Sequence, residues 1–231
     1  MIELKDFLEL LNHKKAALID MDGVLYDSMP WHAKAWRQTM LELDIDIPEE
    51  EFFLYEGMTG PATINLLVER ERGEILTLEE CKEIYSRKAA RFREMGEVAL
   101  ISGAQNMIRG LRNRGIDRVL VTGSAQSSLL DRLEHDYPGG FDRRKRVTAN
   151  DVVNGKPHPE PYLRGLEKAG VKAEDAIVIE NAPLGVQAGK AAGIFTVAVL
   201  TGPIPHKEFE KAGADIIFES MNAFSCLISH F

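Results

Sequence analysis

The stretch AALIDMDGVLYDS, residues 16–28, decides how the rest of the sequence is interpreted. Its first four residues are apolar, and a short run that is apolar on both faces is typical of a strand buried inside a parallel sheet. Two carboxylates, Asp20 and Asp22, follow the run, and Gly23 comes next. Because ligands of open parallel sheets bind beyond the carboxyl ends of the strands, the stretch predicts a central strand and the start of a site.

The same pattern continues outward as an alternation of short apolar runs and helical periodicity. Four further strands are expected, at residues 119–121, 176–179, 196–200 and 214–218. The helices expected between them cover residues 104–114, 126–133, 159–169 and 184–192, with C-terminal glycines at Gly115, Gly170 and Gly193. This alternation predicts an α/β fold, a doubly wound parallel sheet with helices on both faces.

One segment interrupts the alternation, because residues 28–97 contain helical patterns and no convincing strand. The helices expected there cover residues 30–43, 49–55, 62–72 and 78–95. Their methionine and aromatic residues are interpreted as apolar core. A helical block inserted after the first strand predicts an α-helical cap domain at 28–97, over an α/β catalytic core formed by 1–27 and 98–231.

The composition is that of a globular protein, with 231 residues, 45% of them hydrophobic and 28% charged. A formal net charge of -8 argues against nucleic acid and anionic membranes as partners. Cys81 and Cys226 stand far apart in no metal-ligand spacing, which favours a reducing compartment. The sequence shows neither a signal-peptide pattern nor an apolar run long enough for a membrane span, so a cytoplasmic protein is expected.

The polar groups that follow the predicted strands are the types that phosphoryl transfer needs. They are Asp20, Asp22, Thr122, Gly123, Ser124, Lys156, Glu180 and Asn181. Asp20 and Asp22 project to the same side, because they stand two apart on an extended chain. One carboxylate can attack phosphorus and form an aspartyl-phosphate, while the other moves the proton. A cation must then bridge carboxylate and phosphate, and Mg²⁺ suits such an oxygen-rich site.

The remaining groups have matching roles in this hypothesis. The Thr122 hydroxyl and the Gly123 backbone N–H can hold phosphate oxygens, and Lys156 supplies local positive charge in an acidic protein. Ser124 either joins this phosphate site or only caps the next helix. Glu180 and Asn181 offer oxygens on the metal side.

Together these motifs resemble the haloacid dehalogenase superfamily, close to its β-phosphoglucomutase and small-phosphatase branch with a helical cap. The matching stretches, in the family's order, are DMDGVLYDS, VLVTGS, GKPHPEPY and VIENAPLGVQAGKAAGI. The resemblance implies Asp20 as the nucleophile, Asp22 as acid and base, and Thr122 and Lys156 as phosphate ligands. It also implies a Mg²⁺ ion whose ligands are Asp20, the Asp22 backbone carbonyl, Glu180 and Asn181.

The sequence departs from the family pattern at the last motif, which often reads Glu-Asp and here reads Glu180-Asn181. Losing a carboxylate should weaken the Mg²⁺ site, and Glu56 in the cap segment YEGMTG is a candidate to replace it. In mutases that resemble this chain, a Lys stands at the position of Glu56, and an Arg near Gly60 holds the substrate's second phosphate. Their absence argues against an intermediate that carries two phosphates.

Two cap residues retain the mutase pattern. His32 stands where the mutases have a His near the acid/base Asp, and Lys88 resembles a cap Lys that contacts substrate. A sugar-phosphate mutase therefore remains an alternative, and a non-catalytic phosphate-binding regulator is a third. The leading prediction is a monomeric, Mg²⁺-dependent phosphohydrolase for a small phosphate compound, with inorganic pyrophosphate as a candidate.

Overall fold

The computed structural model describes residues 3–124 and 127–230, and its centre is a six-stranded parallel sheet. The strands are β1 (Ala16–Ile19), β2 (Asp117–Val121), β3 (Arg146–Val147), β4 (Ala176–Glu180), β5 (Phe195–Val199) and β6 (Ile216–Phe218). They lie in the order β3-β2-β1-β4-β5-β6, so β1 is central and pairs with β2 and β4. The direction of strand succession reverses beside β1, and ligands of open α/β sheets bind at such a point.

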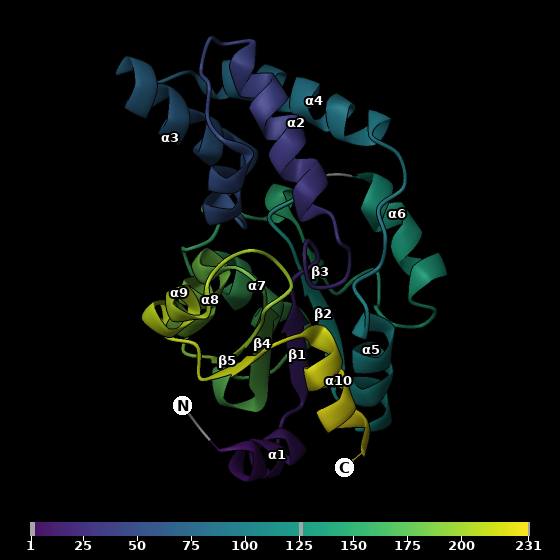
Figure 1. Cartoon of the computed structure of the whole chain (residues 1–231). Coiled ribbons are helices and arrows are strands. Elements are labelled where there is room, and N and C mark those ends of the chain that lie inside the picture. The colour runs from purple at the N-terminus through teal and green to yellow at the C-terminus, as the bar shows by residue number, and fades with distance from the viewer. Residues whose placement is uncertain (1–2, 125–126, 231) are drawn as a thin grey trace.

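Helices cover both faces of this sheet (Figure 1). One face carries α1 (Leu4–Asn12), α5 (Ala104–Asn113), α6 (Ser127–Asp136) and α10 (Met221–His230). The other carries α7 (Glu160–Ala169), α8 (Pro183–Ala191) and α9 (His206–Ala212). Within β1, Ala17 and Ile19 pack toward the first face and Ala16 and Leu18 toward the second. Because both faces are covered, β1 is apolar throughout.

A helical segment leaves the sheet after β1 and returns before α5, and we call it the cap. It consists of α2 (Met29–Leu41), the 3-10 helix η1 (Glu49–Tyr55), α3 (Gly60–Arg72) and α4 (Leu78–Glu94). These elements share an apolar cluster of their own, which includes Phe52, Ile64 and Ile84. Figure 1 shows the cap above the end of the sheet where β1 runs toward α2. The exact division into two domains stays a prediction.

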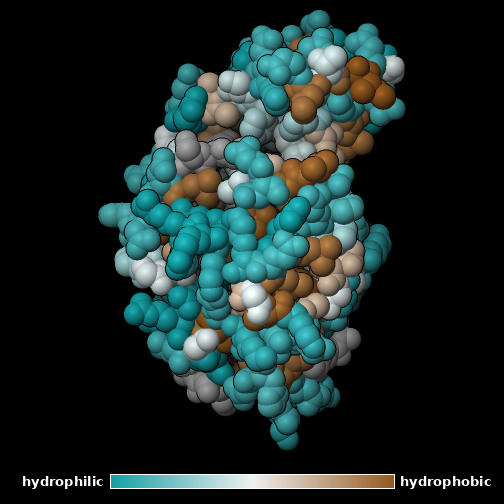
Figure 2. Space-filling model, turned by 180° about the vertical axis from the view of Figure 1, so that it is seen from behind, coloured by the Kyte–Doolittle hydropathy of each residue, from teal (hydrophilic) through white to brown (hydrophobic). Residues whose placement is uncertain are grey.

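The two chain segments that join cap and core lie side by side. The backbone N–H of Asp27 donates to the Ala99 carbonyl at 2.9 Å, and Tyr26 forms an antiparallel bridge with Leu100. Figure 2 shows the molecule from behind, with the cap above the core and hydrophilic residues covering most of this face. Among the described residues, no helix is long and apolar enough to cross a membrane.

The predicted α/β fold is confirmed, and its three predicted helix-terminal glycines have φ between 68° and 73°. The sequence did not predict α1, β3, α9 or α10. Strand β3 has only two residues, which is too few to leave a recognisable apolar run. Short 3-10 turns, η2 (Ala149–Asp151) and η3 (Ala173–Asp175), complete the connections. The predicted start of the helix at Gln126 lies outside the described residues, and α6 is described from Ser127.

Candidate active site

The side chains predicted for phosphoryl transfer meet at the carboxyl ends of β1, β2 and β4. Asp20 is the first residue after β1, Thr122 is the first after β2, and Glu180 is the last of β4. Ile19 pairs in register with both neighbouring strands, so these ends are level. The backbone N–H of Asp20 donates to the Ile179 carbonyl at 3.1 Å. The sheet therefore holds the three side chains at one edge.

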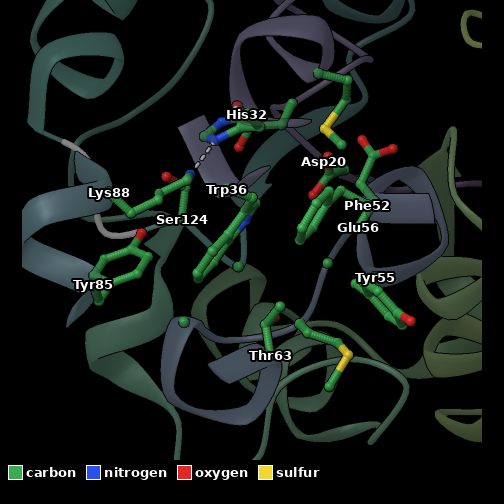
Figure 3. Close-up of a pocket in the computed structure, with 16 residues that line it drawn as sticks. Asp20, His32, Trp36, Phe52, Tyr55, Glu56, Thr63, Tyr85, Lys88 and Ser124 are labelled. Atoms are coloured by element: carbon green, nitrogen blue, oxygen red, sulfur yellow. Dashed lines mark hydrogen bonds and ion pairs between the residues drawn. The ribbon is translucent and has the colours of Figure 1, made fainter. Parts of the chain in front are cut away.

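A cavity of about 60 Å³ lies between this edge and the cap (Figure 3). The core side is lined by Asp20, Asp22, Gly123 and Ser124, and the cap side includes His32, Trp36, Phe52, Glu56, Gly60, Tyr85 and Lys88. Among the described lining residues, Lys88 is the one Lys or Arg. The aromatic side chains of Trp36 and Tyr85, interpreted from sequence as core, also form a wall of the cavity.

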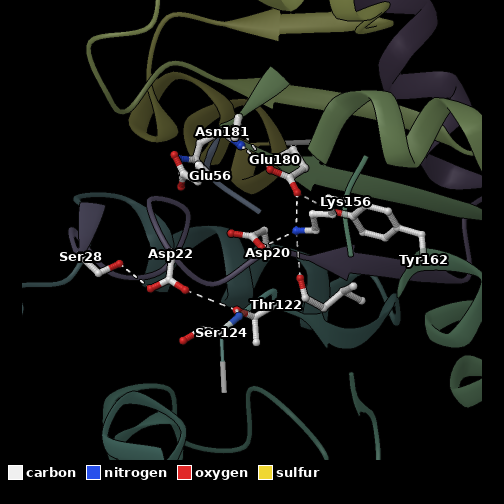
Figure 4. A network of polar contacts seen from close by, with 12 residues as sticks. Asp20, Asp22, Ser28, Glu56, Thr122, Ser124, Lys156, Tyr162, Glu180 and Asn181 are labelled. Carbon is white, nitrogen blue, oxygen red and sulfur yellow. Dashed lines mark hydrogen bonds and ion pairs between the residues drawn. The ribbon is translucent and has the colours of Figure 1, made fainter. Parts of the chain in front are cut away.

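Lys156 is the centre of a buried polar network beside this cavity (Figure 4). Its Nζ lies 2.5 Å from Asp20 Oδ1 and 2.5 Å from Glu180 Oε1, and it donates to the Val121 carbonyl at 3.3 Å. Burial by itself would lower the pKa of Lys156, but the charges of Asp20 and Glu180 outweigh burial and raise that pKa. The network therefore keeps a positive charge next to Asp20.

Glu180 is hydrogen-bonded through both oxygens. Oε1 accepts from Lys156 and from the Tyr162 hydroxyl at 2.6 Å, and Oε2 accepts from the N–H groups of Asn181 at 3.0 Å and Ala182 at 3.3 Å. Because a carboxylate has about four acceptor positions, the protein occupies them all. These hydrogen bonds suit a group that positions Lys156, and the expected role of Glu180 as a metal ligand stays a prediction. Tyr162 was not singled out, although it lies within GKPHPEPY.

Asp22 is buried and hydrogen-bonded at both oxygens. Its Oδ1 accepts from Ser28 Oγ at 2.6 Å and lies 3.0 Å from His32 Nε2, while Oδ2 accepts from Thr122 Oγ1 at 3.3 Å. Burial would raise the pKa of Asp22, but the charge and hydrogen bond of His32, with Ser28 and Lys88, lower it to about 2. Ser28 was not predicted as a site residue, although it is the last residue of the stretch 16–28.

Of the three residues after β2, two line the cavity and one holds Asp22 by a hydrogen bond. Gly123 and Ser124 line the cavity. The Thr122 hydroxyl instead accepts from the Ser124 N–H at 3.0 Å and donates to Asp22. A Cβ on Gly123 would lie 2.6 Å from the carbonyl oxygen of Gly57, so a glycine permits the close approach of the cap loop.

His32 connects Asp22 to Lys88. Its Nδ1 lies 2.5 Å from Lys88 Nζ. When Lys88 is protonated it can only donate, so His32 Nδ1 accepts from Lys88 and Nε2 carries the hydrogen that His32 donates to Asp22. Lys88 Nζ also lies 5.0 Å from the centre of the Trp36 ring and 5.5 Å from that of Phe92. Burial lowers the pKa of Lys88 to about 7. Of the two cap residues singled out from sequence, His32 therefore contacts the predicted acid and base directly, and Lys88 contacts His32.

Glu56 reaches from the cap to the core. Asn181 Nδ2 donates to Glu56 Oε1 at 2.9 Å, and both side chains are buried. The other polar atom of this amide, Asn181 Oδ1, is buried without a hydrogen-bond partner. Burial raises the pKa of Glu56 well above its usual value, and repulsion from Asp20 adds to the effect. Burial likewise raises the pKa of Asp20, against the attraction of Lys156.

These observations fit a divalent cation. Asn181 Oδ1 is buried without a hydrogen-bond partner, and Asp20 and Glu56 are buried carboxylates whose pKa values are raised. A Mg²⁺ ion would satisfy these oxygens. In the described parts of the chain, no three His, Cys, Asp or Glu side chains form a group that could hold a metal ion. A Mg²⁺ ion would therefore need Asn181 Oδ1 as well as Asp20 and Glu56. The family resemblance implies the Asp22 backbone carbonyl as a further ligand.

Comparison with known proteins gives a consistent result. Residues 14–193 match the family of haloacid dehalogenase-like hydrolases. Hexitol phosphatase A of Escherichia coli is 28% identical over 80% of the chain and 82% of that relative. A phosphorylated carbohydrates phosphatase of Thermotoga maritima is 32% identical over 78% and 82%. A solved structure described as a "putative beta-phosphoglucomutase" from Bacteroides vulgatus has a TM-score of 0.90 and 44% identity, and covers 96% of the chain and 94% of its own.

The chain belongs to the haloacid dehalogenase-like hydrolases. Within that family it falls in the β-phosphoglucomutase-like branch of phosphatases, so the resemblance drawn from the four motifs is confirmed. Family membership establishes a phosphatase-type enzyme.

Proposed function

We propose that the protein is a Mg²⁺-dependent phosphohydrolase that acts through an aspartyl-phosphate on a compact phosphate compound, with inorganic pyrophosphate as the leading candidate. The observation that carries this proposal is Asp20 on the floor of a small cavity, held 2.5 Å from the Lys156 ammonium. The cap side presents one ammonium, Lys88, and one carboxylate, Glu56. A short substrate that carries charge at both ends would match these charged groups on the core side and the cap side of the cavity.

The proposed chemistry has two steps. Asp20 attacks phosphorus, the bond from phosphorus to the bridging oxygen breaks, and that oxygen keeps the electron pair and takes a proton from Asp22. Asp22 then takes a proton from water, the water oxygen attacks phosphorus, and the bond to Asp20 breaks. One pyrophosphate and one water give two phosphates.

The surroundings of Asp22 suit these two roles unequally. Its pKa of about 2 keeps Asp22 ionised, which is the form that the second step starts from. In the first step it must carry one. His32 contacts both Asp22 and Lys88, so the hydrogen-bonded chain offers a route for that proton.

The residues that would hold Mg²⁺ are Asp20, the Asp22 backbone carbonyl, Asn181 and Glu56. Bound there, the ion would neutralise carboxylate charge and draw a phosphate group toward Asp20. Because Glu56 belongs to the cap, we propose that the metal site is complete only when the cap is closed.

A sugar-phosphate mutase is the second candidate. The 44% identity to the Bacteroides vulgatus structure and the pairing of His32 with Lys88 favour it. Against it, Glu56 and Gly60 leave the cap loop without the two positive groups that the mutase pattern carries.

A phosphate-release screen with Mg²⁺ tests the proposal, using pyrophosphate, sugar phosphates and nucleotides. We expect release from pyrophosphate that is lost on Asp20→Asn and on addition of EDTA. The panel includes β-glucose 1-phosphate, whose conversion to glucose 6-phosphate without phosphate release would support the mutase instead. Pyrophosphate left intact by active protein would overturn the leading substrate.

A further inference from the structure

Gly60 is a glycine because a neighbouring ring leaves no room for a side chain. A Cβ at Gly60 would lie 2.2 Å from Tyr85 Cδ2, 2.6 Å from Cε2 and 2.7 Å from Cγ. Gly60 is the first residue of α3, and its φ lies outside the left-handed region, so its backbone conformation does not require glycine. The space beside its Cα is what the glycine provides, and the Tyr85 ring fills that space.

The Tyr85 ring forms part of the cavity wall opposite the reacting carboxylates. Its centre lies 6.1 Å from that of Trp36, and the Trp36 ring is stacked 6.4 Å from Phe52 with an interplanar angle of 6°. Lys88 follows Tyr85 by three residues on α4, so both face the cavity, and Lys88 Nζ lies 5.8 Å from the Tyr85 ring centre. In Figure 3, Tyr85 lies beside Lys88 and Trp36.

The cavity wall that contains Tyr85 and Lys88 faces the leaving group of a substrate that reacts with Asp20. Asp20 and Asp22 line the core side of the cavity, so a phosphoryl group in reach of Asp20 directs its remaining atoms toward Gly60, Tyr85 and Lys88. The cavity of about 60 Å³ has space for a few water molecules. A departing phosphate can pair with Lys88 there, whereas a sugar ring would need the volume that Tyr85 occupies.

We propose that Tyr85, seated against the bare Cα of Gly60, is the residue that limits substrate size by closing the leaving-group side of the site. This inference rests on the proposed function, because it takes Asp20 as the reacting end. The excluded substrates are phosphate esters of ring-sized alcohols, and the admitted ones are pyrophosphate and short esters. Gly60 and Tyr85 act as a unit, because the ring can occupy its position only while residue 60 has no Cβ.

The test compares kcat/KM for pyrophosphate with kcat/KM for glucose 6-phosphate. In Tyr85→Ala the ratio should fall about tenfold or more, since a single methylene in a pocket already discriminates by about 10–200-fold. Tyr85→Phe is the matched control and should keep the wild-type ratio, because it keeps the ring. A folded Tyr85→Ala protein with the wild-type ratio would overturn the proposal.

A second pair of variants tests the contact itself. Gly60→Ala should disturb catalysis by displacing the Tyr85 ring, and Gly60→Ala should have little further effect in a Tyr85→Ala background, where the space is open. Coupling of this kind is expected for residues in contact. Additive effects of the two substitutions would contradict the proposed unit.

The size limit and the proposed substrate can fail separately. If wild-type protein leaves pyrophosphate intact, the substrate proposal fails. The size limit is then tested separately, by the rates of hydrolysis of methyl, glycerol and glucose phosphates. Rates that fall along this series in wild type and level out in Tyr85→Ala would support the filter. A wild-type preference for the glucose ester would overturn the filter whichever substrate proves natural.

Discussion

Asn181 of the core donates a hydrogen bond to Glu56 of the cap, with 2.9 Å between Nδ2 and Oε1. The contact joins the two halves of the proposed metal site, because Asn181 Oδ1 is left as a buried oxygen without a hydrogen-bond partner. Glu56 is therefore the carboxylate that we propose replaces the one missing from the last motif.

The first prediction concerns the Mg²⁺ requirement. Glu56→Ala should raise the Mg²⁺ concentration that gives half-maximal phosphate release by tenfold or more, because losing even an indirect partner of a metal typically costs about 10–100-fold in affinity. Glu50→Ala, at an exposed carboxylate of the 3-10 helix that precedes Glu56, is the control. An unchanged Mg²⁺ requirement in Glu56→Ala would exclude Glu56 from the metal site.

The second prediction concerns cap closure. A Cβ at Gly155 would lie 2.8 Å from Thr59 Cγ2 and 2.9 Å from Thr59 N, and the φ of Gly155 lies outside the left-handed region. Gly155→Ala should therefore oppose the cap–core contact without straining the core, lowering kcat/KM about tenfold while Tm stays nearly constant. Gly202→Ala is the control, because nothing lies within 4 Å of a Cβ there. Wild-type activity in Gly155→Ala would show that the contact is dispensable.

The sequence predicted the core side of the site because parallel strands end at one edge. Because Asp20, Thr122 and Glu180 each lie at the carboxyl end of a predicted strand, they were expected together. It could not show that Glu180 is fully occupied by Lys156, Tyr162 and backbone N–H groups, because that saturation depends on packing between distant segments.

The cap side was predicted less completely. Glu56 was expected near the metal because the last motif lacks a carboxylate, and the structure places it against Asn181. Trp36 and Tyr85 were interpreted as part of the apolar core of the cap. A helical apolar pattern does not reveal which part of a cap helix faces the site on the α/β core. Their position in the cavity wall follows from how the cap sits on the sheet.

The third prediction concerns pH. Burial lowers the pKa of Lys88 from 10.5 to about 7, so between these values the unfolded chain holds a proton that the folded chain has lost. Stability therefore rises with pH in this window, and the full penalty of burying the charge remains below pH 7. Against Lys88→Met, wild type should gain up to about 1.4 kcal/mol of unfolding free energy per pH unit.

Urea unfolding of both proteins at several pH values from neutral to mildly alkaline measures this difference. Both proteins share every other titrating group. Lys88 also lowers the pKa of His32, so the measurements stay above the ordinary His32 value of 6.5. Lys207→Met, at an exposed lysine, controls for the loss of a positive charge alone. A difference between wild type and Lys88→Met that does not change with pH would show that folding leaves the protonation of Lys88 unaffected.

The fourth prediction concerns the buried network. Lys156→Met keeps the length of the side chain and removes the ammonium between Asp20 and Glu180. Removing one partner from a buried ion pair typically costs about 3–5 kcal/mol, because the other partner stays buried without compensation. In a chain of this size that corresponds to a fall in Tm of about 6–20 °C, with loss of turnover.

The sign of its pH dependence distinguishes this cause from poor packing of the methionine. Without Lys156, the pKa of Asp20 rises further, so the folded variant takes up a proton that the unfolded chain binds only at lower pH. The stability deficit of Lys156→Met relative to wild type should therefore grow between mildly acidic and neutral pH and shrink on acidification. Thermal unfolding of both proteins across that range measures it, with Lys207→Met as the control. A deficit independent of pH would assign the loss to packing, and an unchanged Tm would show that the ammonium contributes no net stability.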